Sequence, residues 1–525
     1  MSEQGAVSAA TKEAREAGEG ILASGGNAFD AIVASAIALA VTEPGNSGLG
    51  GEGYCILYDA RAAQAGSLCF MSVPGGLATP GNLVGKDFLR GAAASLVPGA
   101  VAGWFALISE KCSREAGELL GPAIRLAEEG FEVTESMAGA LNWMADQFHP
   151  SAQEIFVQAD RPWRAGDRLI QPELARTLRV LAEGGQQAFY EGEFAEQMDR
   201  FFCDTGGLLR KRDLVAYRPL WQRTLSRRFG DVEVHVPPPE STGFSVLYGL
   251  ELLARLGYDS MPFGGLAAAR TMVSVLREMV ARADELAAHQ TPYEPGVEQA
   301  VARLLEDVEL AKAAKRLGGD ARGCGSCLGK HTTSLSACDS RGNLACLTQT
   351  LDHGFGSGVV IPGTGVLMNN GMAWLNTDPS TSRADLVAPH KRFFVPVVRL
   401  SRSALRVSRY LPSELRVATG SRRRHYKCMP ASCSAAVHFE LRSTGPGSPS
   451  ELSCRNGATR KTSRSRAASS RKSTRICRDP IRPMATRTSA VFTLCSSLRT
   501  QAMWRSVIRE RRANTLRLAE GGHHV

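Results

Sequence analysis

The sequence predicts an α+β fold in which helices surround a central sheet, followed by an irregular basic tail. Three observations predict it. Residues 1–320 show mainly helical periodicity with a few strands, whereas residues 332–375 alternate apolar and polar side chains as strands do. Residues 401–525 hold 26 Lys and Arg against 6 Asp and Glu, while the first 400 residues hold 36 against 46. The net charge of +10 at pH 7 therefore comes entirely from the tail.

Composition narrows the class of protein. With 43% apolar and 22% charged residues, the chain is typical of globular proteins. Residues 1–10 lack the basic start and apolar core of a secretory signal, so the compartment is unknown and we expect the cytoplasm by default. The longest apolar run, residues 28–41, is shorter than the ~20 residues of a membrane span, so no membrane partner is expected. The single CxxC motif, at residues 324–327, favours a thiol pair in a linker over a metal site.

The N-terminal part begins with two predicted helices separated by a glycine turn. Residues 11–23 have an amphipathic pattern, and residues 28–41 are apolar on nearly every face, which predicts a buried helix. The glycine-rich residues 44–53 then lead into a strand at residues 54–58. Nucleotide-binding glycine loops need the reverse order, a strand before the glycines and a helix after them, so a tight turn with closely packed backbone is favoured. Further on, the pattern predicts a strand at residues 232–236 and helices near residues 94–109, 122–131, 169–190, 244–256 and 265–316.

Residues 330–350 predict a β-hairpin with two threonines at its open end. Folding the hairpin brings Thr332 and Thr350 together, and paired hydroxyls there are a candidate nucleophile arrangement, although most strand threonines are structural. The preceding residues 318–330 are glycine-rich and aperiodic, which would allow the chain to cut itself before Thr332. Turn residues join the strands at 339–343. The apolar residues expected on one face are Leu335, Ala337, Leu344 and Leu347.

These motifs resemble the gamma-glutamyltranspeptidases. Residues 331–336 and 348–351, with Asp339 between them, are similar to the start of that family's small subunit, and residues 25–31 and 43–51 resemble its N-terminal signature. Shorter motifs follow in family order at residues 97–99, 171–172, 188–190, 214–217 and 237–239. The resemblance covers about residues 8–400.

The resemblance implies a four-layer αββα sandwich of the N-terminal nucleophile hydrolase type, made as a precursor that cuts itself. Cleavage of the His331–Thr332 bond would give a large-subunit region, residues 1–331, associated with a small subunit whose nucleophile region is 332–400. The freed α-amine of Thr332, with a pKa near ~8, would act as the base for its own hydroxyl. Thr350 would orient that hydroxyl. The substrate would be a small amide or peptide, glutathione-like or another acyl amide, and no metal or cofactor is implied.

The residues that would select a glutamyl donor differ from the family pattern. Residues 72–80 lack the Arg that clamps the donor's α-carboxylate, and Asp352 stands where the family has Asn. Residues 371–374 lack the acid that holds the donor's ammonium. Without these charge-assisted contacts a glutamyl donor is not favoured, and Asp352 is the substrate-binding candidate that would repel its carboxylate.

The elements expected to stabilise the oxyanion also differ. Residues 393–395 replace a serine pair, and residues 422–425 follow a family-like lead-in without the expected glycine pair. Each lost oxyanion donor would cost roughly 3–4 kcal/mol of transition-state stabilisation.

Residues 401–525 form an Arg- and Ser-rich tail without clear periodicity. A basic nucleic-acid-binding arm is one interpretation. We favour the other, that the reading frame is lost between about residues 393 and 425, so nucleic acid is not an expected partner. Three functions stay open: a gamma-glutamyltranspeptidase-like amide hydrolase and acyltransferase, an acylase of the same fold on a non-glutamyl amide, and a non-catalytic homologue.

Overall fold

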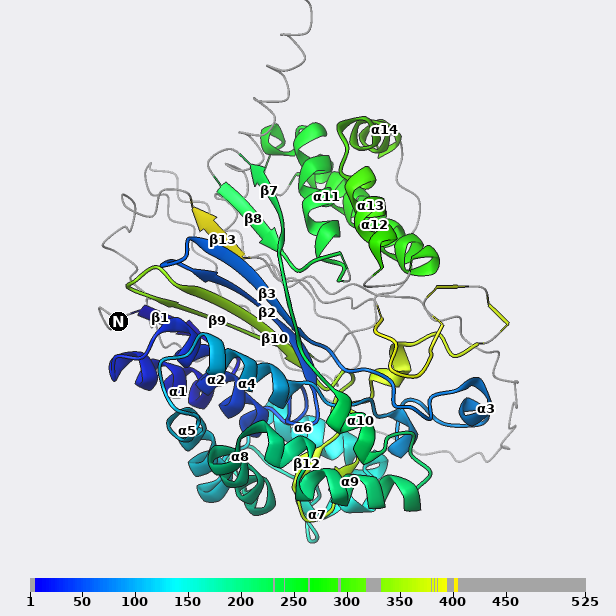
Figure 1. Ribbon diagram of the computed structural model, residues 1–525. Coiled ribbons are helices and arrows are strands. Elements are labelled where there is room, and N and C mark those ends of the chain that lie inside the picture. The colour runs from blue at the N-terminus through cyan, green and yellow to red at the C-terminus, as the bar shows by residue number, and fades with distance from the viewer. Residues whose placement is uncertain are drawn as a thin grey trace, which may run out of the picture. The chain divides into compact units, whose positions relative to one another are not determined.

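The centre of the protein is a six-stranded antiparallel sheet in the order β1-β9-β10-β2-β3-β6 (Figure 1). The computed structural model describes residues 5–229, 232–239, 241–262, 265–290, 294–317, 332–378, 380–381, 383–384, 386–393 and the backbone of 401–404. The strands are β1 (Gly5–Ser8), β2 (Glu52–Asp59), β3 (Gln64–Phe70), β6 (Leu220–Gln222), β9 (Thr333–Asp339) and β10 (Leu344–Thr350). The predicted hairpin, β9 and β10, thus lies between two strands from the N-terminal part of the chain.

Helices cover one face of this sheet. They include α1 (Lys12–Ala23), α2 (Ala28–Thr42), α4 (Ala100–Glu110), α5 (Ala116–Glu129) and α8 (Pro172–Tyr190). Every residue of α2 is buried, as its sequence predicts, and the helix contacts β9 and β10. The hairpin residues buried in this core are Leu335, Ala337, Ala345 and Leu347. The expectation for Leu344 is wrong: it lies three positions from Leu347, so it points to the opposite face and is only half-buried.

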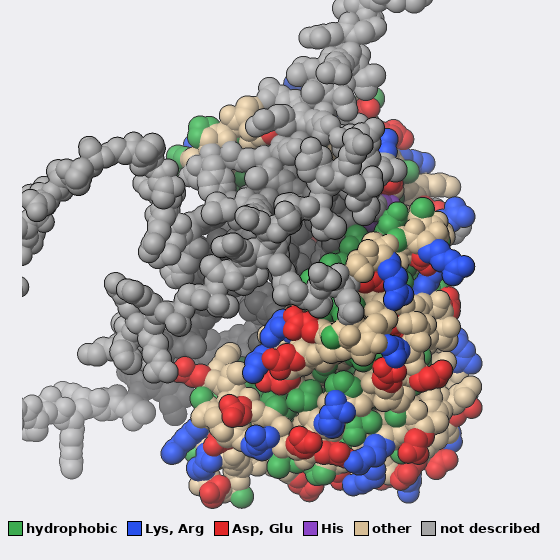
Figure 2. Space-filling view, turned by 90° about the vertical axis from the view of Figure 1, so that its left-hand side faces the viewer, with side chains coloured by type: hydrophobic (Ala, Val, Ile, Leu, Met, Phe, Trp, Pro, Cys, Tyr) green, Lys and Arg blue, Asp and Glu red, His purple; other side chains and the backbone are tan. Residues whose placement is uncertain are grey.

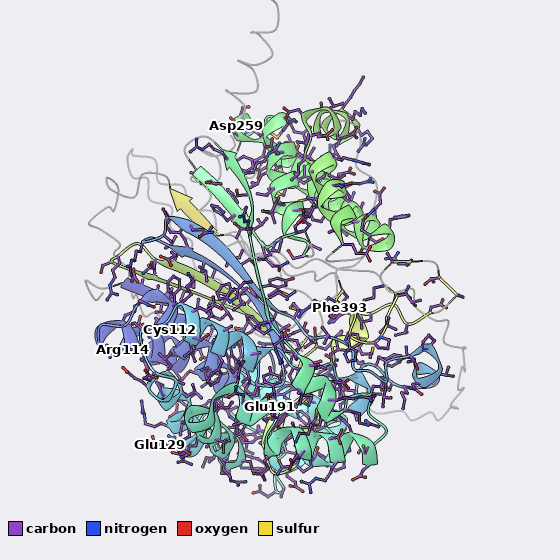
Figure 3. All side chains as sticks on the ribbon, in the orientation of Figure 1. Cys112, Arg114, Glu129, Glu191, Asp259 and Phe393 are labelled. Atoms are coloured by element: carbon purple, nitrogen blue, oxygen red, sulfur yellow. The ribbon has the colours of Figure 1, made fainter. Side chains whose placement is uncertain are left out.

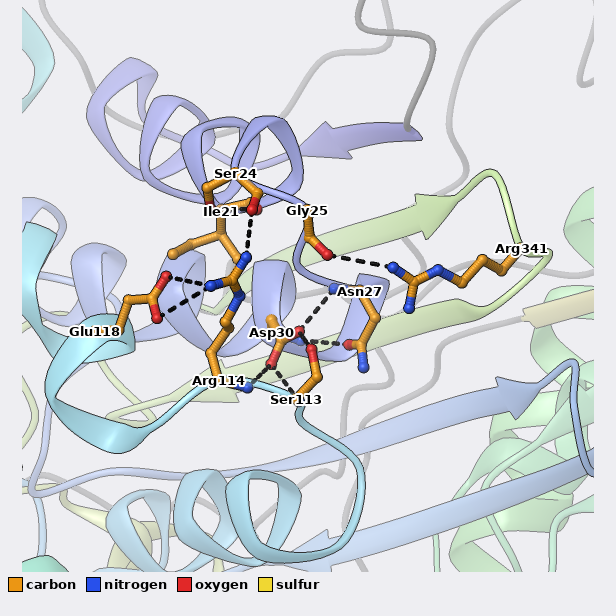
Figure 4. Close-up of polar contacts among 9 residues, drawn as sticks. All are labelled: Ile21, Ser24, Gly25, Asn27, Asp30, Ser113, Arg114, Glu118 and Arg341. Atoms are coloured by element: carbon orange, nitrogen blue, oxygen red, sulfur yellow. Dashed lines mark hydrogen bonds and ion pairs between the residues drawn. The ribbon is translucent and has the colours of Figure 1, made fainter.

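A buried carboxylate fastens the start of α2 (Figure 4). Asp30 accepts hydrogen bonds from the backbone N–H of Asn27 at 2.7 Å, of Ser113 at 2.8 Å and of Arg114 at 3.0 Å, and from the Ser113 hydroxyl at 2.6 Å. The next N–H along, that of Ala28, donates to Asp339 in the turn of the β9–β10 hairpin at 3.0 Å. The N-terminal signature therefore joins α2 to the hairpin that carries the two threonines.

The remaining helices of this part are α3 (Pro80–Leu83), α6 (Glu135–Met144), α7 (Pro150–Phe156), α9 (Glu193–Asp204) and α10 (Lys211–Ala216). Two small antiparallel sheets accompany them, β4 (Phe131–Glu132) with β5 (Arg168–Leu169), and β11 (Val360–Ile361) with β12 (Val366–Leu367). Helix α5 begins six residues before the predicted start at 122, and Pro122 lies inside it.

A second core forms around a three-stranded sheet in the order β13-β8-β7. Its elements are β7 (Leu225–Phe229), β8 (Val232–Val236), β13 (Ser401–Ala404), α11 (Gly243–Arg255), α12 (Leu266–His289), α13 (Pro295–Leu304) and α14 (Asp307–Leu317). The predicted helical stretch 265–316 is therefore three helices. Strand β13 pairs antiparallel with β8. The sequence predicts no strand after residue 400, so β13 was not expected.

The mixed α+β class predicted from the sequence is confirmed. Acidic and basic side chains are interspersed over the described surface on the face seen in Figure 2. Within the described ranges, no helix is both long and apolar enough to span a bilayer. The CxxC motif and nearly all of the basic tail lie outside the described residues.

Candidate active site

The open end of the β9–β10 hairpin brings two hydroxyls together. The register pairs Thr333 with Gln349, so one further step places Thr332 opposite Thr350. The Thr332 hydroxyl donates to the Thr350 hydroxyl at 3.2 Å. Thr332 is half-buried and Thr350 is 4% exposed. The proximity predicted from the strand alternation is thus present in the structure, while His331 lies outside the described residues.

The chain after β10 supports Thr350. The backbone N–H of Asp352 donates to the Thr350 hydroxyl oxygen at 2.8 Å. Asp352 adopts a φ of 80°, in the left-handed region that non-glycine residues rarely occupy, which turns the chain back toward the threonine. On the other face of the strand, Gln349 accepts from the Trp104 indole at 3.2 Å and donates to the carbonyl of Ala36 at 2.8 Å. Gln349 before Thr350 and Asp352 after it are therefore both held by hydrogen bonds.

A carboxyl group that sequence reasoning missed lies beside the pair. Glu52 is opposite Thr350 in the β2–β10 register and is 1% exposed. One of its oxygens accepts from the Ser72 N–H at 2.9 Å, and its side chain is hydrogen-bonded to that of Asp352. Burial raises the pKa of Glu52 well above its ordinary value, the nearby charge of Asp352 raises it further, and the Ser72 hydrogen bonds oppose the rise. The sequence signal that could have identified Glu52 is its position as an acidic residue inside an apolar, glycine-rich run.

Two asparagines hold the loop that follows the hairpin. The fully buried Asn369 side chain donates to the carbonyls of Gly50 at 2.8 Å and Leu96 at 3.0 Å, and accepts from the Leu96 N–H at 2.9 Å. Asn370 accepts from the N–H of His353 at 2.9 Å. These contacts fix the segment that contains Asp352.

The glycine-rich turn before β2 is a packing device, as its order along the chain predicts. A Cβ on Gly50 would lie 2.2 Å from the Leu367 carbonyl oxygen, and one on Gly53 would lie 2.2 Å from the Thr348 carbonyl oxygen. Only glycine lets these backbones approach so closely. The turn thereby sets β2 against β10 at the level of the threonines.

Apolar side chains gather near the ends of β2 and β3. Phe393, labelled in Figure 3, is buried where the sequence departs from the expected serine pair. It belongs to an apolar cluster that also contains Tyr54, Met71, Leu96, Met372 and Leu375. Tyr54 is two residues from Glu52 on the same strand face, so this apolar cluster borders the site.

An aromatic stack completes the surroundings. The His353 and Trp374 rings are parallel within 10°, with centroids 4.5 Å apart. Among the residues that the structure describes, no group of three or more His, Cys, Asp or Glu side chains is arranged to hold a metal ion. The chemistry available here is that of hydroxyls, a carboxyl pair and apolar walls.

Comparison with known proteins points to one family. The model of the family described as Gamma-glutamyltranspeptidase matches residues 14–398. The chain is 30% identical to the glutathione hydrolase proenzyme of Escherichia coli (strain K12), covering 74% of this chain and 71% of that protein. It is 31% identical to the acylase ACY 1 proenzyme of Pseudomonas sp. (strain SE83), covering 77% and 75%. It is 32% identical to the oxamate amidohydrolase proenzyme of Klebsiella pneumoniae, covering 71% of each.

Solved structures with a similar fold include members of the same group of enzymes by name. The cephalosporin acylase of Bacillus halodurans matches with a TM-score of 0.66 and 28% identity, over 77% of this chain and 75% of that chain. The gamma-glutamyltranspeptidase of Helicobacter pylori matches with a TM-score of 0.55 and 25% identity, over 59% of this chain and 91% of that chain. The mixed α+β fold of this chain is thus similar to the folds of a cephalosporin acylase and a gamma-glutamyltranspeptidase. This chain belongs to the gamma-glutamyltranspeptidase family.

Proposed function

We propose that the protein is a self-cleaving amide hydrolase and acyltransferase with Thr332 as nucleophile and Thr350 as its orienting partner. The observation that carries the proposal is the 3.2 Å contact between the two hydroxyls at the open end of the hairpin. A threonine hydroxyl is a weak nucleophile unless a base lies beside it, and a free α-amine on the same residue supplies one. The named proenzymes among the relatives support such a maturation step.

Maturation begins at the bond before Thr332. The Thr332 hydroxyl attacks the carbonyl carbon of His331 and the acyl group moves from nitrogen to oxygen, so the peptide bond becomes an ester and the nitrogen takes the hydroxyl proton and becomes a free α-amine. Water then hydrolyses the ester, which releases the carboxyl group of His331 and restores the Thr332 hydroxyl. In turnover the amine takes the hydroxyl proton while the oxygen attacks the substrate amide. The leaving amine takes up that proton, and water or an acceptor amine releases the acyl group from Thr332.

The layers of the fold and the subunit boundary are part of the same proposal. Helix α2 packs on the six-stranded sheet, α11 packs on the three-stranded sheet, and β13 contacts β2 and β10. These contacts support a four-layer αββα sandwich with the large-subunit region at residues 1–331 and the nucleophile region at 332–400.

The donor is better explained as a non-glutamyl acyl group than as a glutamyl group. Phe393 and Met372 fill an apolar cluster beside the site, and the buried Asp352 would repel a donor carboxylate. Relatives named as acylases stand beside those named as glutathione hydrolases at similar identity, so the family allows both.

The first test is maturation. Purified wild type should split during incubation into residues 1–331 and 332–525, with Thr332 identified as the new N-terminus by mass spectrometry. Thr332→Ala should stay intact. Ser334→Ala is the matched control, because Ser334 is the next hydroxyl on the same strand face, and it should split like wild type. A wild-type chain that stays intact would instead support the non-catalytic homologue.

The second test is the donor. Matured enzyme is offered anilides that carry a γ-glutamyl, a hexanoyl or a phenylacetyl group, and kcat/KM is compared. The apolar acyl groups should be preferred by tenfold or more. Preference for the γ-glutamyl anilide would overturn the acylase assignment and leave the nucleophile assignment standing.

A further inference from the structure

Glu52 lies in a row with the two threonines. Across three neighbouring strands, β2, β10 and β9, the order is Glu52, Thr350 and Thr332, all on one face of the sheet. Glu52 is almost completely buried, and isolated buried carboxylates are costly unless they are protonated or paired.

The partner of Glu52 is the side chain of Asp352, which is 5% exposed. A hydrogen bond between two carboxyl groups requires one proton, because two carboxylates have only acceptors. The Ser72 N–H donates to one oxygen of Glu52 at 2.9 Å, and a protonated Glu52 can supply the O–H of its hydrogen bond with Asp352. The backbone of Asp352 meanwhile donates to Thr350.

We propose that Glu52 and Asp352 share a single proton, and that this buried carboxyl pair is a positioning device for the nucleophile. The inference rests on the proposed function of Thr332. The shared proton holds Asp352 in its left-handed conformation, which keeps its N–H on the Thr350 hydroxyl oxygen. That N–H occupies one acceptor position of Thr350 and so limits how its hydroxyl can meet Thr332.

Loss of the shared proton would disrupt this arrangement. Two negative charges at hydrogen-bond distance repel strongly in a buried site. Asp352 already has an unfavourable backbone conformation, so it is the group that would move. The phenol of Tyr217 also interacts electrostatically with Glu52, as well as with Arg392 and Cys69. The imidazole of His353 follows Asp352 directly.

The titration of the pair can be measured without activity. In the uncleaved Thr332→Ala chain with carboxyl-labelled glutamate, infrared spectroscopy should show one glutamate that stays protonated at neutral pH. Glu52→Gln should remove that signal. If no protonated glutamate is present at neutral pH, the shared proton does not exist and the inference is overturned.

The effect on the nucleophile is tested by the pH profile of self-cleavage, with each variant normalised to its own maximum. Wild type should lose rate on the alkaline side as the pair loses its proton. Glu52→Gln should keep its rate there, because an amide N–H continues to donate to Asp352. Glu52→Ala, which has no donor, should have an absolute rate about ten- to a hundredfold below that of wild type at the pH where wild type cleaves fastest.

The outcomes separate the two proposals. An alkaline fall that is identical in wild type and Glu52→Gln would refute the positioning role. A chain that never self-cleaves, yet shows the protonated glutamate, would refute the proposed function and leave the shared proton in place.

Discussion

The orienting role of Thr350 can be tested against a matched neighbour. Thr348 lies two residues earlier on the same face of β10 and is equally buried. Its hydroxyl is 3.2 Å from that of Ser334, the same separation that joins Thr350 to Thr332. Thr350→Ala and Thr348→Ala therefore remove the same group from the same kind of cross-strand contact. Only the first of the two variants loses a contact with the candidate nucleophile.

The contacts in the structure predict different losses of stability and of self-cleavage rate for the two variants. Each loses a hydroxyl hydrogen bond worth about 1 kcal/mol of folding free energy. Thr350→Ala also leaves the buried N–H of Asp352 without its acceptor, which costs a further 1–3 kcal/mol or so. Loss of orientation at the nucleophile should slow self-cleavage about ten- to a hundredfold. Thr348→Ala should cleave within about twofold of wild type because Thr332 keeps its partner.

The assay is the rate of appearance of the fragment that begins at Thr332, measured by gel and mass spectrometry. Thermal unfolding of both variants in the uncleaved Thr332→Ala background gives their midpoints, and the cleavage assay is run below all of them. Because the contact with Thr332 is already absent in that background, Thr350→Ala reports there only the cost at the Asp352 N–H. Thr350→Ser, which keeps the hydroxyl, should recover most of the rate. The orienting role fails if Thr350→Ala cleaves as fast as wild type, or if Thr348→Ala is slowed to the same extent.

Four further outcomes are expected. Asp352→Asn removes a charge that would face a donor carboxylate, so kcat/KM for a γ-glutamyl anilide should rise about tenfold or more; an unchanged value would exclude that repulsion. Asp30→Asn keeps the shape but replaces one of the two acceptor oxygens with an NH2 group, so two of the four donors lose their acceptor; it should lower the free energy of unfolding in urea by about 3–5 kcal/mol, whereas Ser113→Ala should cost about 1–2. The pKa of Glu52 is raised in the folded state, so its contribution to stability is complete below its unfolded value of 4.5 and is lost as pH rises toward the folded value. The free energy of unfolding of wild type, measured in urea, should therefore fall over that pH range relative to that of Glu52→Gln. If the two proteins give parallel curves of stability against pH, the pKa of Glu52 is not raised. Reading the gene in its other frames beyond about residue 393 should restore a glycine pair followed by helical sequence, and its absence from both frames would end the frame-loss hypothesis.

Local pattern was sufficient for the elements that form the candidate site. The alternation of residues 332–350 predicts both strands, their turn and the meeting of Thr332 with Thr350, because the two sides of a hairpin are close in sequence. The uniformly apolar α2 predicts its own burial for a similar reason. The order of glycines and strand favoured a tight turn over a nucleotide loop, and the absence of room for a Cβ at Gly50 confirms close backbone packing there.

Contacts between distant segments could not be predicted in this way. The pairing of β2 with β10 joins residues almost 300 positions apart, and only that pairing places Glu52 beside Thr350. From the sequence, Glu52 was one polar residue in a glycine turn. The error at Leu344 has a different cause: hydrophobicity suggested one face, but strict alternation assigns Ala345 to the core. Strand β13 depends on pairing with β8 and has no periodicity of its own to reveal it.

Apart from Asp352, the residues that hold the candidate nucleophile are separate from those that would select the donor. The nucleophile region is fixed by main-chain contacts and buried polar groups: the glycine turn sets β2 on β10, Asn369 joins the glycine turn to Leu96, and the N-terminus of α2 is bonded to the hairpin through Asp339. None of these contacts depends on the side chains that would recognise a glutamyl group. Phe393 and its apolar neighbours can therefore replace a polar recognition set without moving the two threonines. A change of substrate at constant nucleophile geometry is what this division of contacts permits, and the anilide comparison measures it directly.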